Sequence, residues 1–234
     1  MTAPVGDAIK MLAALHGHAA FDHAWTEIRS IRAHGGALKQ AFLPTRDIED
    51  IAASSMELRD AANVYFSVSP RMRPEGTKQA VELMPAVWAD IDSTDALIAL
   101  AGFELEPSAV VASGRTGGHH AYWILKEPID VATGETLNAA LARLLTSDPA
   151  VKDAGRILRL PGTLNHKTTP PHEVKLVELN DRRYDREDLI AATTRPDSVT
   201  DEELTRVGGV STRAPSRPVA RLLSKLELVR AKTN

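Results

Sequence analysis

Residues 85–92 read Pro-Ala-Val-Trp-Ala-Asp-Ile-Asp, an apolar run that ends in two carboxylates, Asp90 and Asp92. The run predicts a buried strand. Side chains two positions apart on a strand point to the same face, so the two carboxylates are expected side by side. Adjacent carboxylates repel each other unless a cation lies between them, and Mg²⁺ or Mn²⁺ is the cation that such oxygens favour. The alternative is a surface pair in which Asp92 caps a helix that begins at Ser93.

A glycine-rich segment follows at residues 113–123, which read Ser-Gly-Arg-Thr-Gly-Gly-His-His-Ala-Tyr-Trp. Glycine lets backbone N–H groups approach an anion closely and permits positive φ, so the segment suits a phosphate group. On the strand expected after it, His120 and Tyr122 point to one face, whereas His119 and Trp123 point to the other. One imidazole is therefore expected at the phosphate site. A plain glycine hairpin with a surface histidine is the alternative.

A third segment, residues 153–167, reads Asp-Ala-Gly-Arg-Ile-Leu-Arg-Leu-Pro-Gly-Thr-Leu-Asn-His-Lys around a Pro-Gly turn. Asp153 is a candidate third carboxylate for the metal. Arg159 and Lys167 suit a triphosphate, the first through its planar fork of donors and the second as a point charge. A solvated loop with ordinary surface ion pairs is the alternative.

The bulk composition is that of an ordinary globular protein. The 234 residues are 43% hydrophobic and 25% charged, enough for a substantial core. There is no cysteine, which fits a reducing cytoplasm and excludes thiolate zinc sites and thiol catalysis. The net charge of −3 argues against attraction of the whole molecule to nucleic acid, but not against a local basic groove. No apolar run is long enough to predict a membrane span, and no signal peptide is expected.

Expected helices and strands interleave along the chain. The apolar spacing predicts helices at 5–34 (in two pieces), 46–60 with Thr45 as N-cap, 93–102, 133–146 and 185–192. It predicts strands at 37–43, 63–69, 83–92, 109–112, 119–126 and 172–179. This order favours an α+β or mixed α/β domain over residues 1–193. A linker is expected at 194–216, followed by a basic helix or the start of a further domain at 217–234.

Taken together, the order of the three motifs resembles the archaeo-eukaryotic primase superfamily, above all the primase-polymerase domains of phage and plasmid replication proteins. The resemblance runs from about Ala62 to Leu189. Its most specific parts are Arg-Leu-Pro-Gly-Thr-Leu-Asn-His-Lys at 159–167 and His-Ala-Tyr-Trp at 120–123. The glycine loop at 113–118 is longer than the family pattern.

The resemblance implies a fold and a site. The fold is an RRM-like sheet that carries the metal-binding acids, packed on an N-terminal α/β unit. Asp90, Asp92 and Asp153 are implied as ligands of two Mg²⁺ or Mn²⁺ ions, with Asp148 a weaker candidate than Asp153. The implied nucleotide-binding residues are Ser113, Gly114, Arg115, Gly118, His120, Arg159, Asn165, His166 and Lys167. No zinc is expected, because the chain lacks the cysteines of the zinc-binding stem that some relatives carry.

The implied activity is template-directed nucleotidyl transfer that makes or extends primers on single-stranded DNA. The implied partners are the template and primer, NTPs or dNTPs, and a helicase fused or separate, in the cytoplasm of a bacterial host. We expect Arg71, Arg73 and Lys78 to meet the template backbone. Two alternatives stay open: a replication-initiation or single-strand-binding module without activity, and a metal-dependent nuclease. A nicking nuclease needs His-apolar-His on one strand face, and the adjacent His119 and His120 argue against it.

Overall fold

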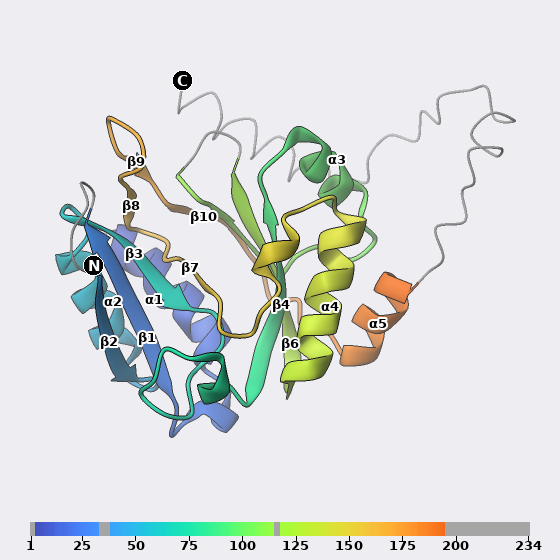
Figure 1. Cartoon of the computed structure of the whole chain (residues 1–234), viewed down its shortest axis with the longest axis horizontal. Coiled ribbons are helices and arrows are strands. Elements are labelled where there is room, and N and C mark those ends of the chain that lie inside the picture. The colour runs from blue at the N-terminus through green and yellow to red at the C-terminus, as the bar shows by residue number, and fades with distance from the viewer. Residues whose placement is uncertain (1–2, 33–37, 115–117, 195–234) are drawn as a thin grey trace, which may run out of the picture.

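The computed structural model describes residues 3–32, 38–114 and 118–194 (Figure 1). The predicted linker, apart from Thr194, and the predicted C-terminal segment at 217–234 lie outside these residues, as does Arg115. Within them, no helix is both long and apolar enough to cross a membrane.

Two four-stranded sheets, antiparallel throughout, form the frame of the molecule. The first has the order β2-β1-β3-β7, with strands β1 (Trp25–Arg32), β2 (Lys39–Pro44), β3 (Ala62–Ser67) and β7 (Ile157–Arg159). The second has the order β10-β5-β6-β4, with strands β4 (Leu83–Ile91), β5 (Ala109–Ala112), β6 (His119–Asp130) and β10 (Lys175–Leu179). A separate ribbon pairs β8 (Leu164–Asn165) with β9 (His172–Glu173).

Helices cover the two sheets. They are α1 (Ala3–His16), α2 (Ile48–Glu57), α3 (Thr94–Gly102), α4 (Val131–Leu144) and α5 (Arg186–Thr194), with short 3-10 turns η1 (Ala19–Phe21), η2 (Lys78–Ala80) and η3 (Pro149–Val151). Helix α1 packs on α2 and also reaches β10, whereas α4 lies along β4 and against α5. In Figure 1 the first sheet and α2 therefore stand on one side, and the second sheet with α4 and α5 on the other.

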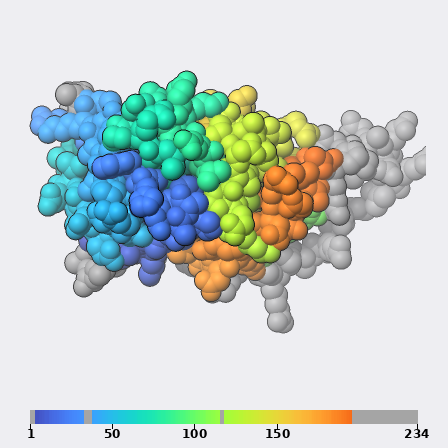
Figure 2. Space-filling view, turned by 90° about the horizontal axis from the view of Figure 1, so that it is seen from below, coloured from blue at the N-terminus to red at the C-terminus, as the bar shows by residue number. Residues whose placement is uncertain are grey.

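One hydrophobic core joins both halves. A single cluster includes Leu12 of α1, Phe66 of β3, Trp88 of β4 and Leu158 of β7. Seen from below, the N-terminal residues (blue to cyan) and α5 (orange) belong to one continuous body (Figure 2). The mixed α/β fold predicted from the sequence is thus confirmed, and β7 carries the third motif from the second sheet back to the first.

Two local predictions are wrong. Residues 25–32 form strand β1 rather than a helix, because β2 and β3 pair with this segment on both sides and provide partners for its backbone. Thr45 is not the N-cap of α2. Asp47 holds that position, without a side-chain cap bond, and the Thr45 side chain is buried.

The predicted strand 119–126 is longer than expected, since β6 continues through Pro128 to Asp130. The pairing with β4 is irregular between Ile124 and Ile129. Pro128 lies in this irregular stretch, where no backbone N–H is needed for pairing with β4.

Candidate active site

Asp90 and His120 lie opposite each other on two adjacent strands of the second sheet. They are register partners on β4 and β6, and His120 Nε2 lies 3.8 Å from Asp90 Oδ1. The Asp90 side chain is 19% exposed and that of His120 only 6%. Asp92 follows the strand end and is exposed. Ser93 caps α3 by accepting from the Ala96 N–H, so the alternative in which Asp92 is the cap is wrong.

His120 is a neutral imidazole at pH 7. Burial lowers its pKa to about 3, and the positive charge of Arg159 adds to the effect. Its Nδ1 is buried and has no hydrogen-bond partner within the described part of the chain. The ring meets that of Tyr122 edge to face, with centroids 6.5 Å apart. The predicted shared face of His120 and Tyr122 is confirmed, because Trp123 packs away from it on Phe103.

Arg159 is a buried guanidinium held by neutral groups. It is 5% exposed, its Nη1 donates to Asn63 Oδ1 at 2.8 Å, and its charge lies 4.9 Å from the centre of the Tyr65 ring. Among the described residues it forms no ion pair with a carboxylate. Burial lowers its pKa, yet a guanidinium stays charged in proteins. Because an unpaired buried charge is costly, this arrangement suits an anionic ligand.

The third motif also holds the glycine loop. Asn165 Nδ2 donates to the Ser113 carbonyl at 3.0 Å, and the Ser113 N–H donates to the Gly118 carbonyl at 2.9 Å. Gly114 has φ 70°, and a Cβ there would lie 2.8 Å from Asn165 Cβ. Only glycine fits this backbone conformation and close approach. The two predicted phosphate-binding segments are therefore in direct contact.

His166 and Lys167 follow Asn165, and they differ in exposure: His166 is partly buried, whereas Lys167 is exposed. Lys167 has an exposed side chain, and its N–H donates to Asn165 Oδ1 at 3.0 Å. The N–H of His166 donates to Asn63 Oδ1 at 3.0 Å, and its imidazole Nε2 is 2.8 Å from the Arg59 carbonyl oxygen. These contacts attach the turn to the start of β3. A nucleotide contact by His166 stays a prediction.

Asp153 lies between η3 and β7, half-exposed, with Oδ2 3.5 Å from Arg156 Nη2. The described residues contain no group of three or more His, Asp or Glu side chains able to hold a metal ion, so Asp153 does not assemble with Asp90 and Asp92 here. Asp148, the weaker candidate, caps η3 by accepting from the Ala150 N–H. A third carboxylate ligand stays a prediction. Mg²⁺ often binds through one or two carboxylates and substrate phosphates, and the partly exposed Asp90 and the exposed Asp92 have the donor chemistry for it.

The expected template contact at Arg71 is wrong. Its side chain is completely buried, and its Nη2 lies 2.8 Å from Oε2 of the equally buried Glu27. A second hydrogen bond, from Nη2 to the Gly155 carbonyl at 2.8 Å, joins this pair to the segment before β7. Arg73 and Lys78 are about half-exposed.

Three residues near the site were not singled out from the sequence as functional: Asn63, Tyr65 and Tyr122. Asn63 is an amide between the apolar residues Ala62 and Val64 of a strand, a weak signal for a buried hydrogen-bonding role. Nothing in the sequence indicates that it meets Arg159, which is 96 residues away.

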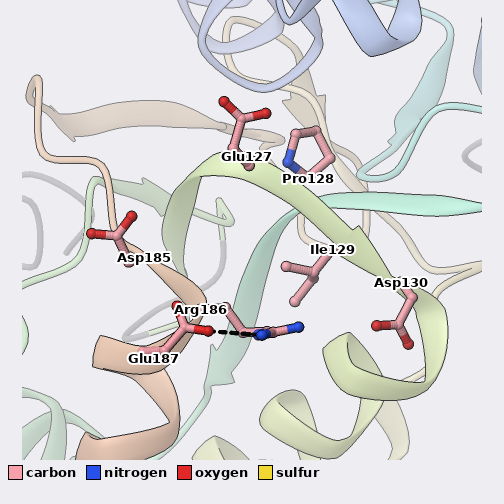
Figure 3. A pocket seen from close by; sticks show the side chains of 7 residues that line it. All are labelled: Glu127, Pro128, Ile129, Asp130, Asp185, Arg186 and Glu187. Carbon is pink, nitrogen blue, oxygen red and sulfur yellow. Dashed lines mark hydrogen bonds and ion pairs between the residues drawn. The ribbon is translucent and has the colours of Figure 1, made fainter.

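A separate pocket of about 330 Å³ lies at the opposite end of β6. It is lined by Glu127, Pro128, Ile129, Asp130, Asp185, Arg186 and Glu187 (Figure 3). Its charged groups have partners: Asp130 caps α4, Asp185 pairs with Lys126, and Arg186 pairs with Glu187. Because it lies at the far end of β6 from His120, this pocket is distinct from the Asp90–His120 site.

No protein-family model and no curated protein matches the chain. Solved structures do. The archaeo-eukaryotic primase domain of the cyanophage S-2L primase-polymerase matches with a TM-score of 0.63 and 19% identity, over 80% of this chain and 97% of that domain. Primase RepB' matches with a TM-score of 0.59 and 18% identity, over 94% of this chain and 69% of that one.

The catalytic domain of primase RepB', solved in complex with initiator DNA, matches with a TM-score of 0.58 and 17% identity. The match covers 87% of this chain and all (100%) of that domain. The chain therefore has the fold of the archaeo-eukaryotic primase catalytic domains, as its motifs predicted.

Proposed function

We propose that the chain is a primase-polymerase: a metal-dependent nucleotidyltransferase that makes or extends primers on single-stranded DNA in phage or plasmid replication. The observation that carries the proposal is the buried Arg159, which has no acidic partner in the described residues and lies close enough to the neutral His120 to lower its pKa. His120 in turn faces Asp90. A site that joins an unpaired cation, a neutral imidazole and a carboxylate suits a nucleoside triphosphate with its metal.

In the proposed mechanism, the chain positions the nucleotide and stabilises charge, and no protein nucleophile is required. Arg159, His120 and Lys167 hold the phosphates, and the loop at Ser113–Gly114 and Gly118 presents backbone near them. Asn165 keeps this loop against the third motif. Asp90 and Asp92 would hold Mg²⁺ or Mn²⁺, which would supply activation of the primer 3′-hydroxyl and stabilisation of the pyrophosphate leaving group. Asp153 is the proposed third carboxylate, and it must approach Asp90 to take that role.

The proposed nucleic-acid partner is a single-stranded DNA template with its primer. One structure of the same fold, the RepB' catalytic domain, was solved with initiator DNA. Arg73 and Lys78 are the candidates for contact with the template backbone, and binding should weaken steeply as salt rises. We also propose that the chain works with a helicase, fused or separate, in the bacterial cytoplasm.

The test supplies single-stranded DNA, labelled nucleotides and Mg²⁺ or Mn²⁺, with and without an annealed primer, and compares the wild type with Asp90→Asn. We expect products that disappear in the variant, while circular dichroism shows an unchanged fold. Products formed without primer establish priming, and products formed only with primer establish extension. DNA binding without synthesis points instead to a binding module, and shortening of the DNA points to a nuclease. An Asp90→Asn protein that extends at the normal rate refutes the metal assignment.

A further inference from the structure

Tyr122 is a fully buried tyrosine beside the proposed metal-binding carboxylate. It lies on β6 two residues after His120, opposite Trp88 of β4, and its side chain has no exposed surface. Its hydroxyl has no hydrogen-bond partner within the described residues. The neighbouring Trp88 differs, because its indole N–H donates to the Val151 carbonyl at 2.8 Å. Since buried hydroxyl groups are almost always paired, an unpaired one needs an explanation.

Asp90 is the diagonal cross-strand neighbour of Tyr122, because it lies on β4 two residues after Trp88, the register partner of Tyr122. Burial is the main cause that raises the pKa of the Tyr122 hydroxyl well above its usual value, and the negative charge of Asp90 adds to it. The phenol is therefore a neutral donor beside a carboxylate. The last torsion of an aspartate has a broad, shallow energy profile, so the Asp90 carboxylate can rotate at low cost.

We propose that Tyr122 is a positioning residue for Asp90: its hydroxyl donates a hydrogen bond to the Asp90 carboxylate when that carboxylate holds a divalent cation. The inference rests on the metal site of the proposed function. Donors that hold a metal-binding carboxylate fix its orientation, and their loss typically weakens metal binding by about 10- to 100-fold. Without metal the same hydroxyl is a buried group that has no partner among the described residues, which lowers stability.

Metal affinity and stability together distinguish a positioning role of the Tyr122 hydroxyl from a structural one. Tyr122→Phe removes the hydroxyl and keeps the ring that packs on His120. A structural hydroxyl would cost stability when removed, but this one is unpaired, so we expect the midpoint of thermal unfolding to stay the same or rise. Tyr184→Phe is the matched control, because the Tyr184 hydroxyl donates to the Glu106 carbonyl. The control should lower the unfolding midpoint and leave metal affinity unchanged.

The experiment titrates each variant of the 234-residue chain with Mn²⁺ alone, following free Mn²⁺ by electron paramagnetic resonance, and records thermal unfolding without metal. We expect Tyr122→Phe to bind Mn²⁺ about 10- to 100-fold more weakly than the wild type. In an Asp90→Asn background, Tyr122→Phe should have no further effect on Mn²⁺ binding. The Tyr122→Phe change should lower kcat for primer extension, and its effect on KM for the nucleotide should be small.

Wild-type Mn²⁺ affinity in Tyr122→Phe overturns the proposal, as does a loss of stability as large as that of Tyr184→Phe. If the wild type binds no Mn²⁺, both the positioning role and the proposed metal site fail. If Mn²⁺ binding follows the expected pattern but no nucleotide is incorporated, the positioning role stands and the proposed activity fails.

Discussion

Replacing Arg159 with methionine tests the central feature of the site. Methionine keeps a long, flexible apolar side chain against Tyr65 and removes the charge and the donor that reaches Asn63. If Arg159 is reserved for the triphosphate, the variant loses nucleotide binding without losing the fold. If Arg159 is a structural residue, the variant unfolds more easily and any change in nucleotide binding is secondary.

The magnitude follows from the contacts of the guanidinium. A hydrogen bond to a charged group contributes about 1.5–3 kcal/mol, so losing one strong phosphate contact should raise KM for the nucleotide roughly 10- to 150-fold. On the stability side, the 2.8 Å bond to Asn63 is lost, which costs about 1 kcal/mol. The variant also no longer buries a charge without an acidic partner, which offsets that cost. We therefore expect an unfolding free energy equal to or above that of the wild type.

The assay measures KM for the incoming nucleotide in primer extension, and nucleotide affinity by calorimetry for variants too slow to assay. Urea denaturation gives the unfolding free energy. Arg159→Lys keeps the charge and loses the planar fork, so its KM should lie between those of wild type and Arg159→Met. Arg186→Met is the matched control, since Arg186 is half-exposed and pairs with Glu187. It should change neither quantity.

Two results would contradict a role of Arg159 in nucleotide binding. The first is a wild-type KM in Arg159→Met, which would remove the arginine from the nucleotide site. The second is a loss of unfolding free energy clearly larger than the about 1 kcal/mol expected for the lost bond to Asn63, because Arg159→Met leaves no buried charge behind. That outcome would show that the neutral neighbours of Arg159 satisfy it fully.

Substitutions of Glu27, His16 and Asp153 test other parts of the molecule. Glu27→Gln should lower the unfolding free energy by about 3–5 kcal/mol in urea denaturation, because the fully buried Arg71 loses its charged partner; a loss below about 1 kcal/mol would contradict this. Burial lowers the pKa of His16 to about 4 from 6.5, so between these values the unfolded chain binds the proton that the folded one does not. Stability should therefore be fully present above pH 6.5 and fall as the pH drops towards 4, by up to about 3 kcal/mol, and His16→Asn should weaken this dependence relative to wild type in denaturation at several pH values. Asp153→Asn should reduce primer extension as strongly as Asp90→Asn if it is the third metal ligand, and near-normal extension would leave Asp90 and Asp92 as the only protein carboxylates at the metal.

Much of the site could be predicted because its determinants are local. The alternation of side chains along a strand depends on the backbone of that strand alone, so the shared face of His120 and Tyr122 was available from the sequence. The strand that carries Asp90 and the turn at Gly114 also depend on short segments, so the sequence predicted both. The resemblance of three ordered motifs to the primase superfamily predicted the fold, which the solved structures confirm.

Other features depended on partners distant in the chain. Residues 25–32 have apolar positions spaced as in a helix, and only pairing with β2 and β3 makes them a strand. Arg71 is in a polar, basic segment that suggests a surface, but the fold buries it against Glu27, 44 residues earlier.

Residue type and strand periodicity are local properties, so they indicate without a structure which residues could bind metal and phosphate. Which of these residues meet depends on the fold. Strand β7 returns to the first sheet beside β3, and this pairing brings Arg159 to Tyr65 and to Asn63, which is 96 residues away in the sequence. Such a contact depends on the order of strands in a sheet, which short-range spacing does not encode.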